Sequence, residues 1–91
     1  MTRLFMSHRV ADVARWREIF DADAPRRAAA GVQDVGVFHA LGDPNDLLVA
    51  QTHPGSPEEV LAMLQAMMGD PALAESMQKA GVLGVPRTWI G

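Results

Sequence analysis

The stretch LFMSHRVADVARWREIF, from Leu4 to Phe20, decides the fold of this chain. It begins as a short apolar strand, breaks at Ala11-Asp12 and continues as an amphipathic helix. The strand carries His8 near its end, and the helix carries Trp16 on its apolar stripe. If the helix folds back over the strand, the imidazole and the indole face the same cleft.

The first strand, expected at residues 2–10, has large apolar residues on both faces. One face carries Leu4, Met6, His8 and Val10, and the other carries Phe5 and Ser7. A strand of this kind is covered on both sides, whereas one set of helices covers only one side. We therefore expect a second copy of the chain to supply the other cover.

Three helical segments follow from the apolar spacing and the capping residues. They are expected at residues 13–30 with a kink at Pro25, at 57–68 and at 71–80. Asp12, Ser56 and Asp70 precede them as N-caps, because their side-chain oxygens can accept hydrogen bonds from the free amides of the first turn.

The remaining strands are expected at residues 32–41, 46–53 and 85–90, with a tight turn at 42–45 that makes a hairpin of the first two. The order β-α-β-β-α-β is that of a ferredoxin-like α+β sandwich, with an antiparallel sheet and its helices on one face. Right-handed crossovers are expected to place the first and last strands in the centre, parallel to each other. The chain is thus predicted to be one domain over residues 1–91, and two such sheets packed face to face make a dimeric α/β barrel.

Size and composition exclude several classes of function. A chain of 91 residues has a thin core, and because it has no cysteine, disulfides cannot stabilise it, which leaves oligomerisation. The net charge of −3 gives no electrostatic footprint for nucleic acid or an anionic membrane. No apolar run approaches the ~20 residues that span a bilayer, and Met1-Thr2-Arg3 is expected to begin a strand and not a signal sequence. We expect a cytoplasmic homodimer without a nucleic-acid or membrane partner.

Four segments carry a resemblance to a known family: HRVADVARWREIFD (8–21), APRRAAAGV (24–32), GDPND (42–46) and DPALAESMQKAGVLGVP (70–86). They resemble small bacterial proteins of the dimeric α/β-barrel superfamily that contains the antibiotic-biosynthesis monooxygenases. The subgroup is often described only as cyclase-like or uncharacterised. The resemblance implies a homodimer with one ligand cleft per subunit, between the sheet and the helices.

The same resemblance implies which activities to expect. Members include cofactor-independent oxygenases and isomerases or cyclases, and in several a polar residue late in the first strand faces the cleft. His8 occupies that position here. Haem-degrading members use a set of Asn, Trp and His that this chain does not reproduce, so we expect no cofactor.

The candidate site consists of a catalytic residue and an apolar lining. His8 is the candidate catalytic base, because an imidazole with its ordinary pKa near 6.5 suits proton transfer at neutral pH; the alternative is a strand-end histidine bonded to backbone. Trp16 is either an aromatic wall for a flat ligand or a core residue. The candidate substrate-binding residues are Trp16, Phe20, Met6, Met63 and Met67, and core packing is the alternative for Phe20 and for the methionines at 63, 67, 68 and 77.

Other polar residues are weaker candidates. His39 is expected at the same end of the sheet as His8, about two strand spacings (~10 Å) away, and His53 at the opposite end. A metal site would need that gap closed and a carboxylate added, so none is predicted. Arg26 and Arg27 could bind an anionic group, but pairing in solvent with nearby acids is favoured. Those acids are Asp21, Asp23 and Asp34.

Three hypotheses for function follow. The first is a cofactor-independent monooxygenase or isomerase, in which His8 removes a proton from a small hydrophobic or aromatic substrate. The second is a non-catalytic ligand-binding or stress-response module that uses the same cleft. The third is a structural dimer whose cleft is filled. An open cavity beside His8 and Trp16 favours the first two over the third.

Overall fold

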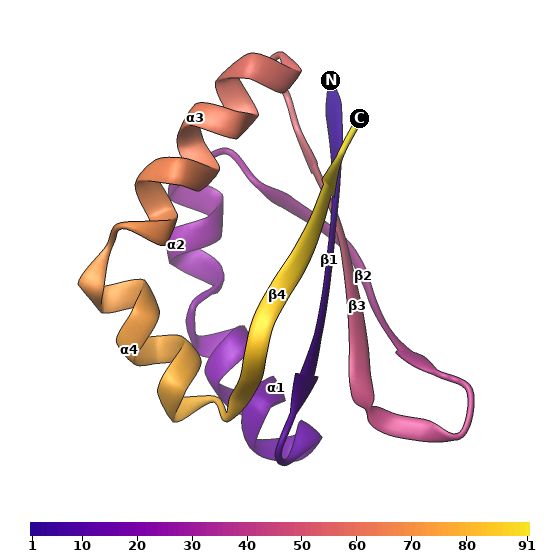
Figure 1. The fold of residues 1–91 in the computed structure, drawn as a ribbon. Helices are drawn as coiled ribbons and strands as arrows, with labels where there is room; N and C mark the ends of the chain where they lie inside the picture. The colour runs from indigo at the N-terminus through magenta and orange to yellow at the C-terminus, as the bar shows by residue number, and fades with distance from the viewer.

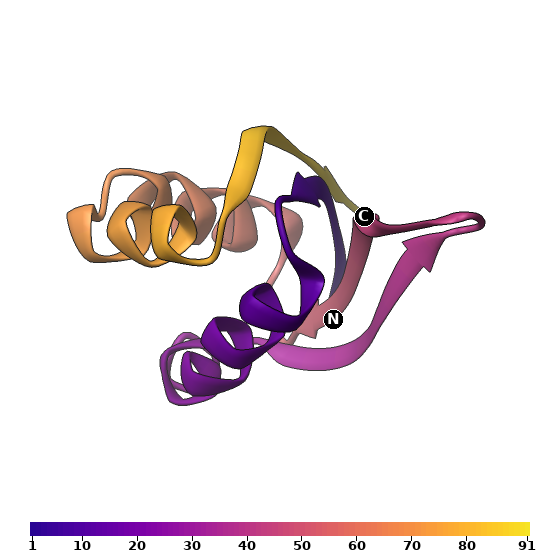
Figure 2. The ribbon, with the colours of Figure 1, turned by 90° about the horizontal axis from the view of Figure 1, so that it is seen from below.

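The computed structural model covers Met1 to Gly91 and contains four strands and four helices. In chain order these are β1 (Thr2–Val10), α1 (Val13–Ala22), α2 (Ala24–Ala29), β2 (Gln33–Ala40), β3 (Asp43–His53), α3 (Pro57–Met68), α4 (Pro71–Lys79) and β4 (Val82–Ile90). All four helices lie on one side of the sheet (Figure 1). Seen from below, they form two pairs, α1 with α2 and α3 with α4, which lie beside each other on that side (Figure 2).

The sheet has the order β2-β3-β1-β4, and all neighbouring strands are antiparallel. This confirms the predicted ferredoxin-like α+β sandwich. The predicted place of the last strand was wrong, because β1 and β3 form the centre while β4 lies at an edge, antiparallel to β1. The reason is that each helical crossover skips one strand position. The crossover from β1 to β2 leaves a gap that β3 fills, and the crossover from β3 to β4 spans β1.

The predicted helix starts at residues 13, 57 and 71 are confirmed by their N-caps. Asp12, Ser56 and Asp70 each accept a hydrogen bond from a backbone amide of the following first turn, and Ser56 completes a capping box. Pro25 lies in the first turn of α2, where backbone N–H groups have no partner within the helix, so the proline costs no hydrogen bond there. The predicted kink is therefore a break between two helices, α1 and α2. Gly31, with φ of +82°, follows the end of α2.

The hairpin between β2 and β3 turns earlier than predicted. The turn is Leu41-Gly42, and Asp43 already pairs with Ala40. Asp43 also forms an ion pair with Arg9 of β1 at 2.8 Å. The turn-favouring residues at 43–45 thus belong to the strand, in which Asp43 pairs with Ala40 of β2 and its carboxylate reaches Arg9 of β1.

The last strand begins at Val82, three residues before the predicted start. Between the paired positions Leu83 and Arg87, β4 contains three residues where β1 has only His8. The resulting bulge includes Gly84, whose φ of +70° is a conformation that glycine adopts without steric cost.

The hydrophobic core lies between the sheet and the helices and is small, since only 11 of the 91 residues are buried. Its cluster consists of Val10, Trp16, Leu47, Val49 and Ala80. A core of this size gives a single copy little stability. No helix is both long and apolar enough to cross a membrane.

The other side of the sheet, which we call the bare face, has an apolar centre. Phe5 on β1 pairs with Ala50 on β3 and with Trp89 on β4, and Phe38 pairs with Leu48 in the next row. Phe5, Phe38 and Trp89 are 38%, 54% and 44% exposed. A sheet face that meets water usually carries polar residues, so this face lacks a cover in one copy of the chain.

Candidate functional site

A cavity of about 140 Å³ lies between the sheet and the two helix pairs. Its lining is mostly apolar, with 14 hydrophobic residues among 20. All six residues named as candidates from the sequence belong to this lining: Met6, His8, Trp16, Phe20, Met63 and Met67. The helices do not pack the cleft shut, contrary to the hypothesis of a filled cleft.

An aromatic row, formed by His8, Trp16 and Phe20, runs along one wall of the cavity. The His8 and Trp16 ring centroids are 5.5 Å apart with planes tilted at 51°, and Trp16 stacks on Phe20 at 4.6 Å and 20°. Trp16 and Phe20 are four residues apart on α1 and so lie on the same helix face. Trp16 is both a buried core residue and part of the cavity wall, so the core alternative is confirmed, and its role as a wall for a flat ligand stays a prediction.

His8 is 8% exposed, and neither Nδ1 nor Nε2 has a hydrogen-bond partner. The alternative of a histidine bonded to backbone is therefore excluded. Desolvation by burial lowers the pKa of His8 below its ordinary 6.5, so the ring is neutral at pH 7. A neutral imidazole has one N–H donor and one acceptor nitrogen. Each unmade hydrogen bond of a buried polar group costs about 1–3 kcal/mol, so a ligand that bonds to this ring recovers part of that cost.

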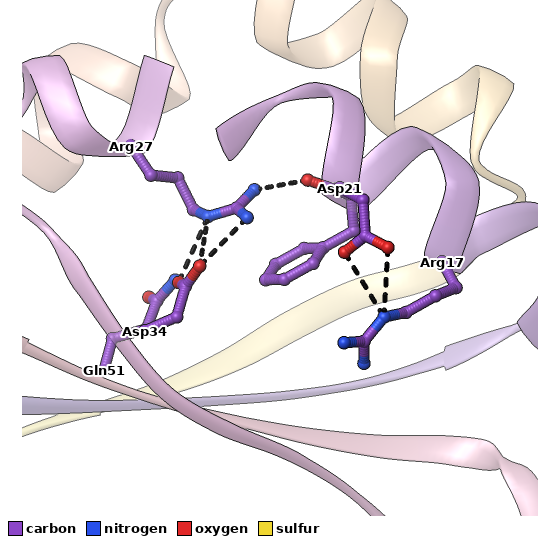
Figure 3. Close-up of polar contacts among 6 residues, drawn as sticks. Arg17, Asp21, Arg27, Asp34 and Gln51 are labelled. Atoms are coloured by element: carbon purple, nitrogen blue, oxygen red, sulfur yellow. Dashed lines mark hydrogen bonds and ion pairs between the residues drawn. The ribbon is translucent and has the colours of Figure 1, made fainter. Parts of the chain in front are cut away.

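Arg27, at the other end of the row, is fully engaged by the protein. Its Nε and Nη2 donate to Asp34 at 3.0–3.1 Å, and its Nη1 donates to the carbonyl oxygen of Phe20 at 2.7 Å (Figure 3). The guanidinium carbon lies 3.6 Å from the centroid of the Phe20 ring. Gln51 also donates to Asp34, at 2.9 Å. The predicted pairing with an acid is confirmed, but the Arg27 side chain is only 11% exposed and so is not in solvent.

Arg26 is held much more loosely. Its Nη2 lies 3.9 Å from Oδ1 of Asp23, and its Nη1 is buried without a partner. The other oxygen of Asp23 accepts a 2.6 Å hydrogen bond from the hydroxyl of Ser76, which connects the α1–α2 junction to α4. All three residues line the cavity. Sequence reasoning named Asp23 only as an acid that pairs with an arginine, and it missed Ser76; the available signal was a serine at helical spacing between Leu73 and Ala80 on an otherwise apolar stripe.

The remaining candidates lie outside the cavity lining. His39 and His8 both pair with Leu47 in the sheet register, so they are two strand spacings apart, as predicted. His53 lies at the opposite end of the sheet, also as predicted. Met68 is 76% exposed and does not line the cavity, unlike the other three helical methionines. No three His, Asp or Glu side chains converge on a position that could hold a metal ion.

Solved structures with the same architecture span nearly the whole chain. Protein Atu4242 from Agrobacterium tumefaciens has a TM-score of 0.70 and 15% identity, with coverage of 100% of this chain and 91% of that one. An uncharacterised NIPSNAP domain protein from Burkholderia xenovorans has a TM-score of 0.68 and 12% identity, with coverage of 100% and 92%. A candidate antibiotic biosynthesis monooxygenase from Nitrosomonas europaea has a TM-score of 0.65 and 8% identity, with coverage of 100% and 96%. This chain has the antibiotic-biosynthesis-monooxygenase-like fold.

The monooxygenase-like fold confirms the architecture that the sequence resemblance implied. At identities of 8–15%, the likeness shows the fold alone. No protein-family model matches the sequence, and no curated protein matches it. The chemistry of the site therefore has to be argued from the residues of this chain.

Proposed function

We propose that this protein binds a small, flat hydrophobic or aromatic molecule in the cavity between its sheet and its helices. The observation that carries the proposal is the mostly apolar cavity, walled by the stacked rings of Trp16 and Phe20. A preformed apolar space with a few polar groups is the usual form of a small-molecule site. Met63 and Met67 supply flexible, polarisable side chains from α3 that can adapt to the shape of a ligand.

Binding of the neutral fluorescent probe N-phenyl-1-naphthylamine tests this proposal. We expect saturable binding to the wild-type protein with a dissociation constant in the micromolar range. Met67→Trp should fill the cavity and abolish binding. Met68→Trp is the matched control, because the neighbouring residue receives the same substitution outside the cavity lining. Equal binding by the two folded variants would contradict a site in this cavity.

We infer that a second copy of the chain covers the bare face, so that two sheets form a dimeric barrel. Three features support this: the apolar centre of the face around Phe5 and Trp89, the small core of a single copy, and the antiparallel sheet with helices on one side only. Packing of identical faces about a two-fold axis buries the same residues in both copies. The cytoplasmic location stays a prediction from the sequence.

Sedimentation equilibrium tests the homodimer. The wild-type protein should sediment with twice the chain mass of 9.8 kDa. Phe5→Glu places a charge at the centre of the bare face and should give a monomer. Leu61→Glu, at an exposed position on α3, should leave the dimer intact. A monomeric wild-type protein at tens of micromolar would exclude this assembly.

The unpartnered His8 supports a second, catalytic candidate function. Its neutral imidazole can take a proton from an acidic C–H of a bound molecule, and return of that proton at another carbon gives an isomer without any cofactor. In an oxygenation, the same substrate anion would transfer one electron to molecular oxygen as co-substrate. Recombination of the two radicals would form a C–O bond, and the resulting peroxide anion would take the proton back from His8. Both reactions begin with proton transfer to His8, and the apolar walls favour an anion whose charge is delocalised.

Exchange of the α-protons of 2-tetralone in D₂O tests proton transfer without knowledge of the natural substrate. The wild-type protein should accelerate the exchange, and His8→Gln should not. His39→Gln is the control, since His39 is exposed and lies outside the cavity lining. Undiminished exchange in His8→Gln would remove the catalytic role and leave ligand binding as the function.

A further inference from the structure

Six polar side chains line the cavity, and the protein itself satisfies four of them. Arg27 and Gln51 donate to Asp34, while Ser76 donates to Asp23. The other two are His8 and Arg26, which each keep buried nitrogen atoms without a partner. The proposed function uses His8 but leaves Arg26 without a role.

The guanidinium of Arg26 has an incompletely compensated charge. Its one acidic neighbour, Asp23, is 3.9 Å away, at the limit of an ion pair. Ser76 holds the other oxygen of that carboxylate at 2.6 Å, which keeps Asp23 from closing on the guanidinium. Arg26 Nη1 is thus the one guanidinium nitrogen of the lining that is buried and unpartnered.

The neighbouring Arg27 does not share this lack of hydrogen-bond partners. The Arg27 side chain is 11% exposed, and its three guanidinium nitrogens all donate to fixed oxygens (Figure 3). The Arg26 side chain is 36% exposed and makes no hydrogen bond to the protein through its terminal nitrogens. It can therefore turn about its side-chain bonds to meet a ligand without any change in α2.

We propose that Arg26 is an anion subsite of the cavity and that the ligand is a flat apolar molecule ending in a carboxylate. This rests on the proposed function, because the apolar body of the ligand occupies the cavity along Phe20 and Trp16. A guanidinium binds a carboxylate through parallel charge-assisted hydrogen bonds, which a neutral carbonyl group cannot match. The fixed carboxylate of Asp23 leaves the Nη1 side of Arg26 for the incoming anion.

Isothermal titration calorimetry with two matched probes tests the subsite. 2-Naphthoate and 2-acetylnaphthalene share the same ring body and carry end groups of similar size, but only the first is charged. The wild-type protein should bind the acid about tenfold more tightly than the ketone. Arg26→Met should remove that preference by weakening the acid alone. Arg17→Met removes an exposed arginine outside the cavity lining and should keep the preference.

The outcomes separate the subsite from the cavity. The proposed subsite at Arg26 is contradicted if the wild-type protein binds the acid and the ketone equally, or if Arg26→Met keeps the preference for the acid. Ligand binding in the cavity is still supported in both cases. If neither naphthalene binds, the cavity and its subsite are both wrong. Should Arg26→Met not fold, as judged by circular dichroism, Arg26→Lys takes its place, since it keeps the charge but loses the paired hydrogen bonds and should lower the preference.

Discussion

The imidazole of His8 lies 5.5 Å from the indole of Trp16, measured between ring centroids. Trp16 comes from the helix that immediately follows the strand of His8, so the chain provides its own aromatic cover for the histidine. This cover contributes to the burial that lowers the pKa of His8. The indole therefore shields from water the neutral imidazole that the proposed proton transfer uses.

The stability of the protein should fall with acid because of His8. Because the pKa of His8 is lowered in the folded protein, there is a pH range in which His8 binds a proton in the unfolded chain but stays neutral in the folded protein. The free energy of unfolding is therefore unaffected by the protonation of His8 above about pH 6.5. It decreases as the pH falls from there towards the lowered pKa, by at most about 1.4 kcal/mol per pH unit. Urea unfolding measures the free energy of unfolding at about pH 7.5 and at about pH 5.5, and the decrease between the two should be smaller for His8→Leu than for the wild-type protein. His39→Gln, which removes an exposed histidine, should keep the wild-type loss.

Arg27 should matter for stability far more than Arg17, although both pair with an aspartate (Figure 3). Arg27→Met leaves the Phe20 carbonyl without its donor, leaves Asp34 with Gln51 as its remaining donor and removes the stack on the Phe20 ring, so we expect a loss of about 2–3 kcal/mol. The pair of Arg17 with Asp21 is solvent-exposed, and Arg17→Met should cost less than about 0.5 kcal/mol. Urea titration of both variants measures the difference. Similar losses would show that the Arg27 contacts do not stabilise the fold.

The emission of Trp89 should report assembly of the proposed dimer. In Trp16→Phe, the remaining indole is Trp89 on the bare face. We expect its emission maximum to lie at short wavelength when the protein is concentrated and to move to longer wavelength on dilution, because dissociation exposes the ring to water. Addition of Phe5→Glu should give the long-wavelength spectrum at every concentration. Emission that does not change with concentration in either background would argue against this interface.

Ser76 should act as a positioning residue for the anion subsite. Ser76→Ala frees the carboxylate of Asp23 to close on Arg26, so the preference for 2-naphthoate over 2-acetylnaphthalene should fall several-fold. Ser76→Thr keeps the hydroxyl and should restore the preference. The ratio of the two affinities is the measurement, because a general loss of stability would weaken both probes alike. An unchanged ratio in Ser76→Ala would show that the hydrogen bond to Asp23 does not position Arg26.

The sequence predicted the elements of this fold well because each has a local cause. The caps at Asp12 and Ser56 and the alternation along β1 act over a few residues. The order of the strands does not have a local cause, which explains why the last strand was expected in the centre. The early start of β3 likewise involves residues outside the predicted strand, since Asp43 pairs with Ala40 of β2 and forms an ion pair with Arg9 of β1.

The candidate site divides in the same way. The position of Trp16 beside His8 follows from one strand, one break and one helix that are contiguous in the chain. The contact of Asp23 with Ser76 joins residues 53 positions apart, and no spacing rule connects them. Arg26 looked like an ordinary surface arginine for this reason, because what distinguishes it is the partner that Asp23 has on another helix.

The aromatic row and Arg26 come from one short stretch, residues 8–26, whereas the facing helices α3 and α4 come from residues 57–79. The groups that could do chemistry and the groups that shape the space are thus encoded in separate halves of the chain. Exchange of the second segment for that of another protein with this fold would change which molecules fit while it keeps His8 and Arg26, provided that the new segment retains a hydroxyl at the position of Ser76. Gene duplication followed by divergence of that one segment would give a set of proteins that share a chemistry and differ in the molecules they accept.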